Sequence, residues 1–582
     1  MSEAKRLPSV ERPWRKFYTE EQLNAEFPDF SLYAYLKKNV SIKPERPALL
    51  YYGTKFNYTE LLAAVDKTAD AYAALGVKAG DIVSFLSVTT PEIVLSLYAL
   101  NKLGAVSNFI DPRMDVGRIV SSVAGTNSKL LVALDITWPK VEKALPDTGV
   151  EKVIIQSPTT YLPTALRVLK NLKDKKTMPD IPYGETVWKW DQFLKGAANA
   201  HAEEYTFAPN EMAVITYTSG TTATPKGVMI TNEGMNAVAD SFWRLTVRWR
   251  SDGGRFLDIM PVFASYGVVC GIHLPMAAML ENVVIPKLDP DKLGSLVSKY
   301  KPTGMMGVPA YYEKMIHSKE MQNEDMSYMW CAGCGGDRIN IELQNQIDDF
   351  LKSHNANHPL SQGYGMSELS SAAICCFKDY TKPDSAGMPM LCTVAGIFDP
   401  DTMEEKTYYE EGEICVTGIS MMKGYYNNPA ETEHVMRLHD DGKVWVHTGD
   451  VGYMDEDGFI FIRGRIKQMI IRFDGHKLHP LTIEKVINEH PAVAMCAVVG
   501  VPDPDHKQGH VPLGVIELRD KSVSDEEKAK LRTEILELCD KELEERGRPA
   551  DVTFIDELPR TSMGKHDYRA LEKQYKDHVF VK

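Results

Sequence analysis

The chain has 582 residues, 44% of them hydrophobic, which is enough for about three to four compact units. Its formal net charge of −14, from 66 basic and 80 acidic side chains, argues against a general nucleic-acid binder. The amino terminus lacks the apolar core of a signal peptide, and the longest apolar region, residues 266–280, is interrupted by His273 and Pro275. We therefore expect no integral membrane segment and a cytoplasmic location.

Helical and strand patterns alternate through the first part of the chain. Residues 59–76 have helical periodicity, residues 80–86 indicate a strand, and a second helix is expected from about Pro91. Apolar runs at residues 130–134 and 153–155 continue this alternation. The pattern predicts an α/β fold in which helices cover parallel sheets.

A loop rich in glycine and hydroxyl residues lies between two short strand patterns, residues 212–216 and 228–230. Its backbone N–H groups and hydroxyls, together with the positive charge of Lys226, predict a phosphate-binding loop. A nucleoside triphosphatase P-loop is excluded because Pro225 and Gly227 flank the lysine, where that motif needs glycine and a hydroxyl residue. A solvated glycine-rich turn is the alternative for this segment alone.

The nine cysteines suggest free thiols in a reducing compartment. The pair Cys331 and Cys334 and the adjacent pair Cys375 and Cys376 lack a partner pair at zinc-finger spacing, so we expect buried or incidental thiols. Ser367 follows Gly365 in a Gly-x-Ser turn, but the second glycine of a hydrolase elbow is missing, and a nucleophilic serine is not expected there.

The last hundred residues predict a small α+β domain. A helix should begin at the capping box of residues 524–527 and end at Gly547. A strand at residues 552–556 then leads into an exposed loop with Lys565 at its tip. A lysine in such a loop is ordinarily just solvated. One face of the helix carries Leu531, Ile535 and Leu538.

Several segments, taken in order, resemble the motifs of the adenylate-forming superfamily, which includes acyl-CoA synthetases, peptide-synthetase adenylation domains and beetle luciferases. Among them are Ser-Gly-Thr-Thr-x-x-Pro-Lys-Gly at residues 219–227 and Gln-Gly-Tyr-Gly-Met-Ser-Glu at residues 362–368. The joint match covers the chain from about residue 30 to 575. The matching segments are 218–227, 330–337, 362–368, 412–418, 422–429, 447–450, 464–467 and 559–565.

The resemblance implies a large N-terminal domain of parallel-sheet-rich α/β subdomains and a small mobile C-terminal α+β domain. The expected division is an N-terminal extension (1–30), the large adenylation domain (31–465), a hinge (466–468) and the small domain (469–582) that carries Lys565.

The resemblance also implies an ATP site. Gly335, Gly336 and Asp337 would lie beside adenine, Tyr364 would stack on it, and Asp450 would bind the ribose hydroxyls as a double acceptor. Arg465 would also reach the ribose, Lys467 would be the hinge residue, and Gly475 would lie on the path of coenzyme A. The remaining expected contacts are Thr218, Ser219, Gly220, Thr221, Thr222, Lys226, Gly363, Gly365, Met366, Ser367 and Lys565.

The implied reaction joins two anions, an acid and the α-phosphate of ATP, so cationic groups must offset their repulsion. Lys565, Glu368 and Lys226 are the expected catalytic residues, with Thr218 and Glu368 holding Mg²⁺. The acyl-AMP formed would then pass its acyl group to a thiol, after the small domain has rotated about Lys467.

The implied acid pocket is mostly apolar and consists of Phe263, Ala264, Tyr266 and Gly267. Ala264 stands where acyl-CoA synthetases often have histidine, and Ala223 and Ser367 are milder departures from the pattern. We expect an acyl-CoA synthetase that acts on a medium or long fatty acid or a bulky acid. Residues 12–18 resemble the start of bacterial fatty-acyl-CoA synthetases, so free coenzyme A is the expected acceptor.

Two alternatives stay open at this point. One is an enzyme that loads a separate acyl or peptidyl carrier protein. The other is a non-catalytic nucleotide or acyl sensor, although such a protein would be expected to lose Lys565, Glu368 or Asp450, and all three are present. The sequence leaves the oligomeric state, including a homodimer, open.

Overall fold

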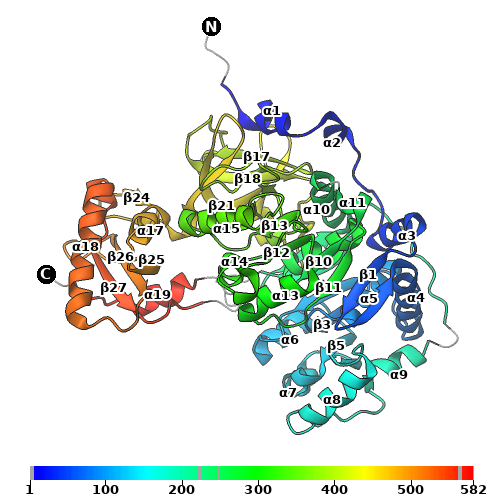
Figure 1. The fold of residues 1–582 in the computed structure, drawn as a ribbon. Coiled ribbons are helices and arrows are strands. Elements are labelled where there is room, and N and C mark those ends of the chain that lie inside the picture. Colours follow the sequence, from blue (N-terminus) through cyan, green and yellow to red (C-terminus); the bar gives the residue numbers. More distant parts are fainter. Residues whose placement is uncertain (1–4, 198–199, 219–224, 247, 561–565, 581–582) are drawn as a thin grey trace.

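The computed structural model describes residues 5–197, 200–218, 225–246, 248–560 and 566–580 (Figure 1). Two large sheets and a smaller antiparallel sheet make up the main body, and the carboxy-terminal unit, orange and red in Figure 1, lies beside it. This arrangement confirms the predicted α/β fold with a smaller carboxy-terminal unit.

The first large sheet has eight strands in the order β19-β9-β8-β4-β3-β5-β6-β7. Its central pairs are parallel, as the alternating pattern predicts, but β8 and β9 pair antiparallel, so the predicted phosphate loop is the turn of a hairpin. The strands are β3 (Ile82–Leu86), β4 (Val106–Ile110), β5 (Leu130–Leu134), β6 (Lys152–Gln156), β7 (Val187–Lys189), β8 (Met212–Tyr217), β9 (Gly227–Thr231) and β19 (Gly424–Tyr425). Helices along this part of the chain are α4 (Tyr58–Ala74), α5 (Pro91–Lys102), α6 (Val116–Ala124), α7 (Trp138–Ala144), α8 (Thr164–Asp174) and α9 (Trp190–Lys195).

The second large sheet has nine strands in the order β16-β15-β14-β13-β12-β10-β11-β1-β2, with a parallel centre and antiparallel edges. Its strands are β1 (Pro47–Tyr51), β2 (Thr54–Asn57), β10 (Arg255–Asp258), β11 (Glu281–Val284), β12 (Gly304–Gly307), β13 (Cys331–Cys334), β14 (Ser361–Tyr364), β15 (Ile374–Cys375) and β16 (Met388–Pro389). The accompanying helices are α3 (Leu32–Ile42), α10 (Asn232–Leu245), α11 (Arg248–Asp252), a π-helix (Tyr266–His273), α12 (Leu274–Ala277), α13 (Leu293–Tyr300), α14 (Pro309–Ile316) and α15 (Ile341–Ser353).

The third sheet of the main body is antiparallel, and its longest strand, β21, pairs with β18, β20 and β22. It consists of β17 (Thr393–Phe398), β18 (Gly412–Gly418), β20 (Met436–Leu438), β21 (Val444–Met454) and β22 (Ile460–Arg465), with α16 (Pro429–Val435) beside it.

The carboxy-terminal unit has apolar clusters of its own, on both faces of the sheet β25-β26-β27. Such separate packing suits a unit that moves as one body. Its elements are β23 (Ile470–Ile471), β24 (Lys477–Leu478), α17 (Pro480–Asn488), β25 (Val493–Pro502), β26 (His510–Leu518), α18 (Asp525–Glu542), β27 (Asp551–Ile555) and α19 (Tyr568–Gln574).

The capping box that begins α18 is confirmed, because the side chains of Ser524 and Glu527 bind each other's backbone N–H. The predicted stop at Gly547 is wrong, since the helix ends at Glu542. Leu543 turns to extended backbone and packs, partly buried, on the apolar cluster of the unit. Tertiary packing therefore ends the helix before the glycine does.

The nine cysteines are all buried and free, as predicted. Within the described part of the chain, no helix is both long and apolar enough to cross a bilayer.

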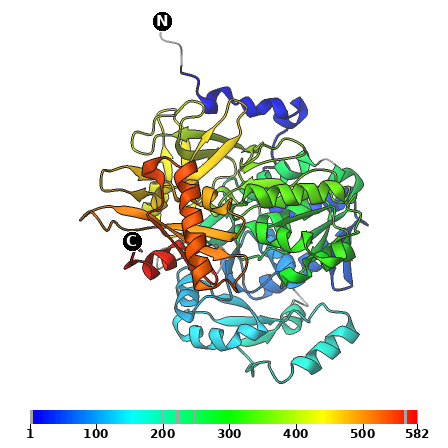
Figure 2. The ribbon, with the colours of Figure 1, turned by 60° about the vertical axis from the view of Figure 1, so that its left-hand side comes forward.

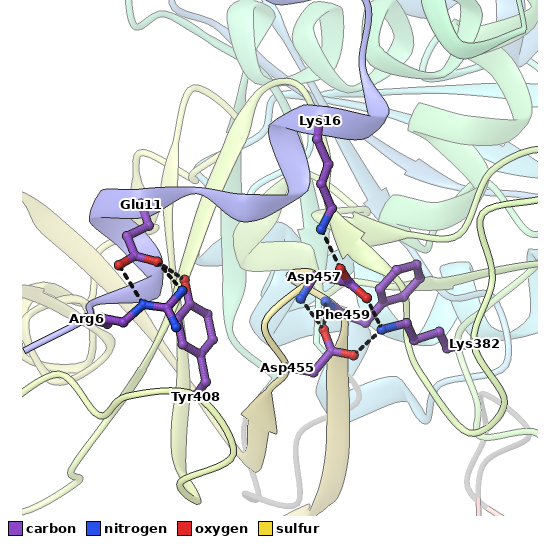
Figure 3. Close-up of polar contacts among 8 residues, drawn as sticks. All are labelled: Arg6, Glu11, Lys16, Lys382, Tyr408, Asp455, Asp457 and Phe459. Carbon is purple, nitrogen blue, oxygen red and sulfur yellow. Dashed lines mark hydrogen bonds and ion pairs between the residues drawn. The ribbon is translucent and has the colours of Figure 1, made fainter.

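The amino-terminal segment, with α1 (Pro8–Glu11) and α2 (Glu20–Asn24), lies along the third sheet and is tied to it by charged contacts (Figure 3). Arg6 pairs with Glu11 and with Glu456, and the Tyr408 hydroxyl donates to Glu11 at 2.7 Å. Lys16 pairs with Asp457.

Trp14 is the apolar anchor of this segment. Its side chain is buried, and a Cβ at Gly458 would lie only 2.9 Å from the Trp14 Cβ. Nearby, Lys382 bridges Asp455 at 2.5 Å and Asp457 at 2.6 Å, which holds the turn that receives the tryptophan (Figure 3).

We expect Trp14→Ala to destabilise the main body by roughly 3–5 kcal/mol, because a large buried ring would leave a cavity. Urea unfolding followed by circular dichroism measures the effect. Val10→Ala is the control, since Val10 lies on the same segment but is 72% exposed. Equal unfolding midpoints for the two variants would show that the segment does not stabilise the sheet.

Candidate functional site

The predicted phosphate loop joins the adjacent ends of β8 and β9. Thr218 N–H donates to the Lys226 carbonyl at 3.2 Å and closes the base of the loop. Lys226 Nζ pairs with Glu431 of α16 and lies 5.2 Å from the centroid of the Tyr425 ring. The predicted contacts Ser219, Gly220, Thr221 and Thr222 lie outside the described residues.

Glu368 lies in a short 3₁₀ turn, Ser367–Leu369, and is buried. The Tyr425 hydroxyl donates to Glu368 Oε1 at 2.6 Å. Burial raises the pKa of Glu368, and the hydrogen bond from Tyr425 opposes that shift. The two predicted catalytic residues Lys226 and Glu368 therefore meet at one tyrosine.

Tyr425 and Glu431 are functional candidates that the sequence analysis did not select. Strand β19 pairs antiparallel with β9, and this pairing brings residues 424–431, which include both side chains, beside Lys226. The signal available in the sequence was the match of residues 422–429 to the family pattern, which includes Tyr425.

The predicted adenine loop follows β13, and its glycines are needed for close packing. A Cβ at Gly335 would lie 3.0 Å from the Gly363 carbonyl oxygen. In the neighbouring loop after β14, a Cβ at Gly365 would lie 1.9 Å from the Ser371 carbonyl oxygen. Gly336 has φ of +79°, a conformation that favours glycine. Asp337 is exposed beyond it.

Asp450 is held from two sides. The Tyr364 hydroxyl donates to Asp450 Oδ2 at 2.6 Å, and Arg465 Nε lies 2.9 Å from Oδ1. Asp450 and Arg465 are also cross-strand partners on β21 and β22. Three residues predicted to contact adenosine are thus in direct contact with one another.

Behind Asp450, Glu413 of β18 fixes the turn that precedes it. Glu413 Oε1 accepts from Gly449 N–H at 2.9 Å, and Oε2 accepts from His447 Nδ1 at 2.7 Å. Burial acts to raise the pKa of Glu413, but the His447 hydrogen bond and charge lower it below its ordinary value. His439 Nε2 lies 2.9 Å from His447 Nε2 and completes a buried chain.

Glu413, Cys415 and His447 are the one set of three candidate metal ligands found in the described ranges. Both ring nitrogens of His447 already have partners in Glu413 and His439, so this set is explained by hydrogen bonding. Glu368 is the better match to Mg²⁺, which prefers oxygen ligands and is commonly held by one or two carboxylates together with substrate phosphates.

The predicted acid segment packs against the nucleotide motifs. Ser265 Oγ lies 3.1 Å from Ser367 Oγ, and the Tyr266 hydroxyl donates to the Gly307 carbonyl at 3.2 Å. Phe263 is buried with the Arg113 guanidinium 5.1 Å from its ring centroid, and Ala264 is half-buried.

Gly267 lies in the first turn of the π-helix Tyr266–His273, where close packing leaves no room for a side chain. A Cβ there would lie 2.0 Å from the Pro261 carbonyl oxygen. The structure therefore brings the predicted acid segment into contact with the loop of residues 363–367 through Ser265 and Ser367.

The carboxy-terminal unit contributes residues near the same place. Lys565 lies outside the described residues. Arg560 and His566, which flank residues 561–565, form a β-bridge. Burial lowers the pKa of His566, and the nearby Asp337 carboxylate opposes this shift. The ends of the predicted lysine loop thus lie near the predicted adenine loop.

Lys467 is exposed in a 3₁₀ turn, Ile466–Gln468, at the boundary between the main body and the carboxy-terminal unit. Gly475 has φ of +79° in the turn between β23 and β24. The neighbouring Asp474 pairs with Arg546 of the same unit at 3.7 Å. Gly475 is therefore not placed among the nucleotide motifs in this orientation, and its role stays a prediction.

Comparison with known families gives two matches. Residues 36–426 match the family model described as AMP-binding enzyme, and residues 482–565 match the AMP-binding enzyme C-terminal domain.

Full-length relatives are ligases. The chain is 29% identical to the long-chain-fatty-acid–CoA ligase of Bacillus subtilis (strain 168), over 98% of this chain and 99% of that one. It is 26% identical to the 4-coumarate–CoA ligase of Vanilla planifolia, over 92% and 91% of the two chains. The ATP-bound structure of MatB from Rhodopseudomonas palustris has a TM-score of 0.78 at 24% identity, covering 94% of this chain and 99% of that chain.

We expect Glu413→Gln to weaken AMP binding about tenfold, or about 1.4 kcal/mol, because the amide nitrogen that replaces one carboxylate oxygen cannot accept the hydrogen bond from Gly449 or His447. Isothermal titration calorimetry measures the dissociation constant. Glu411→Gln is the matched control, since Glu411 is about half exposed and pairs with Arg463 at 3.3 Å. Unchanged AMP binding in Glu413→Gln would show that Glu413 does not position Asp450.

Proposed function

Since the chain belongs to the AMP-binding enzyme family, we propose that it activates a hydrophobic carboxylic acid with ATP and transfers the acyl group to coenzyme A. It is an AMP-forming acid–thiol ligase, with ATP and coenzyme A as substrates. The observation that carries the proposal is the Ser265–Ser367 contact, because it puts the apolar acid segment directly beside the nucleotide motifs.

In the first step, an oxygen of the acid attacks the α-phosphorus of ATP, an acyl-AMP anhydride forms, and pyrophosphate leaves. Lys226, at the base of the predicted phosphate loop, would offset the negative charge of the phosphates. Lys565 is expected to contact the acid and the α-phosphate. Asp450 and Tyr364 would orient the adenosine so that the α-phosphorus faces the acid.

Glu368 is the residue expected to hold Mg²⁺, with Thr218 near the same phosphates. When bound, the ion would supply further positive charge to the phosphates. Tyr425 donates to one oxygen of Glu368 and so fixes the direction in which the carboxylate faces.

In the second step, the sulfur of coenzyme A attacks the acyl carbon, and AMP leaves with the electron pair of the anhydride bond. We propose that the carboxy-terminal unit first rotates about Lys467, so that the Lys565 loop withdraws and the hairpin with Gly475 approaches. The exposed turn at Lys467 supports this, since few contacts oppose a backbone rotation there.

The preference for a hydrophobic acid rests on the residues of the acid segment. Phe263 and Val268 are buried and apolar, and Ala264 leaves space where many relatives are expected to have a larger histidine. The ligase of Bacillus subtilis acts on long-chain fatty acids by its name, and the plant relative acts on 4-coumarate, so both chain-like and bulky acids deserve a test.

We expect acid-dependent AMP release from ATP, and an acyl-CoA product by mass spectrometry, with a fatty acid or a bulky hydrophobic acid. Acetate serves as the small polar control acid. Acid-dependent pyrophosphate exchange without a thioester would point to a separate carrier protein as the acceptor. No acid-dependent ATP cleavage with any acid of the panel would contradict the proposal and favour a sensor.

We expect Glu368→Gln to raise the Mg²⁺ concentration for half-maximal adenylation about tenfold or more, because the amide loses the negative charge that attracts the cation. A magnesium titration of pyrophosphate exchange measures it. Glu433→Gln, an exposed carboxylate on α16, is the control. An unchanged titration curve in Glu368→Gln would remove Glu368 from the metal site.

A further inference from the structure

Helix α8 (Thr164–Asp174) is an unusual surface helix because its apolar side chains face solvent. Leu166, Val168, Leu169 and Leu172 are 47%, 53%, 67% and 68% exposed, and none of the residues in the helix is buried. The helix lies at the periphery of the molecule in both views, at the bottom of Figure 1 and at the lower right of Figure 2, in cyan.

The polar side of α8 is its less exposed side, because Arg167 and Asp174 are the two residues of the helix that are partly buried. Arg167 donates to the Thr160 carbonyl at 3.4 Å, and within the helix Lys170 pairs with Asp174 at 2.6 Å. Burial raises the pKa of Asp135 in the main body, and the nearby Asp174 carboxylate raises it further. A surface helix normally turns its apolar stripe toward the core, so this helix has the opposite orientation.

Positive charge accompanies the exposed leucines. Residues 164–176 include five basic residues and one acidic residue, in a chain whose net charge is −14. Lys173, Lys175 and Lys176 are exposed, and within the described residues they form no ion pair. This local charge is opposite in sign to that of the whole chain, which indicates an anionic partner.

We propose that α8 docks on the surface of an anionic lipid bilayer, with Leu166, Leu169 and Leu172 entering the headgroup region. An amphipathic helix with leucines on one side and lysines beside them is the type that lies in a membrane interface. The lysines would contact the lipid phosphates. A second copy of the chain is a poorer occupant, because a symmetric contact would bring two basic helices together.

Docking would place the enzyme at the surface where hydrophobic acids partition, yet the inference does not depend on which acid is the substrate. It rests on α8 alone, so vesicle binding tests it separately from ligase activity.

The experiment is co-sedimentation of the full chain with vesicles of phosphatidylcholine alone and with vesicles that also contain phosphatidylglycerol. We expect strong binding to the second kind only, and weaker binding as salt is raised. Replacing Lys173, Lys175 and Lys176 by glutamine should weaken it roughly a hundredfold, since each lysine contributes about 1 kcal/mol near such a surface.

The apolar side is tested by replacing Leu166, Leu169 and Leu172 with glutamine, which keeps helix propensity and should weaken binding about tenfold or more. Matched controls make the same number of changes at other exposed positions. They are Val10, Leu438 and Val579 to glutamine for the leucines, and Lys319, Lys352 and Lys530 to glutamine for the lysines.

Circular dichroism and AMP binding show that each variant is folded, and the exposure of the changed side chains makes unfolding unexpected. Failure of the unchanged chain to bind anionic vesicles at low salt overturns the proposal. Binding that survives the leucine changes also overturns it, by assigning the interaction to another surface. Self-association that is lost in the leucine variant, without vesicle binding, would assign α8 to a second copy instead.

Discussion

The carboxylate of Asp450 is the point on which the arrangement of the site depends. One oxygen accepts from Tyr364, the last residue of β14 in the nine-stranded sheet, and the other faces Arg465, the last residue of β22. The antiparallel sheet that carries Asp450 is thereby fixed against the larger sheet, and the chain leaves for the carboxy-terminal unit directly after Arg465. A group suited to bind ribose hydroxyls thus also aligns the main body with the start of the proposed hinge.

Tyr425 has a comparable role on the phosphate side. It donates to Glu368, and Lys226 Nζ lies 5.2 Å from the centroid of its ring, so one tyrosine contacts both an acidic and a basic residue of the predicted phosphate site. Glu431 holds the lysine from its other side. Tyr425 thereby helps to position both residues on the phosphate side of the site.

Much of the fold could be predicted from the sequence, because hydrophobic periodicity and capping residues act over short distances. The helix Tyr58–Ala74, the strand Ile82–Leu86 and the capping box at Ser524 follow from such local signals. The end of α18 did not, because the packing of Leu543 decides it. The glutamate behind Asp450 was also missed: Glu413 becomes relevant only when β18 pairs with β21. Periodicity likewise indicates that α8 has an apolar side and a polar side, but it does not indicate which of them faces the protein.

The carboxy-terminal unit is held in its present orientation partly by charge. Lys485 of α17 pairs with Asp384 of the main body, and Arg519 of the carboxy-terminal unit lies 3.6 Å from Glu342 of the main body. These side chains are partly exposed, so dissolved ions weaken their attraction. If the unit rotates as proposed, ionic strength would shift the balance between its two orientations, and a salt effect on turnover would report on that balance as well as on substrate binding.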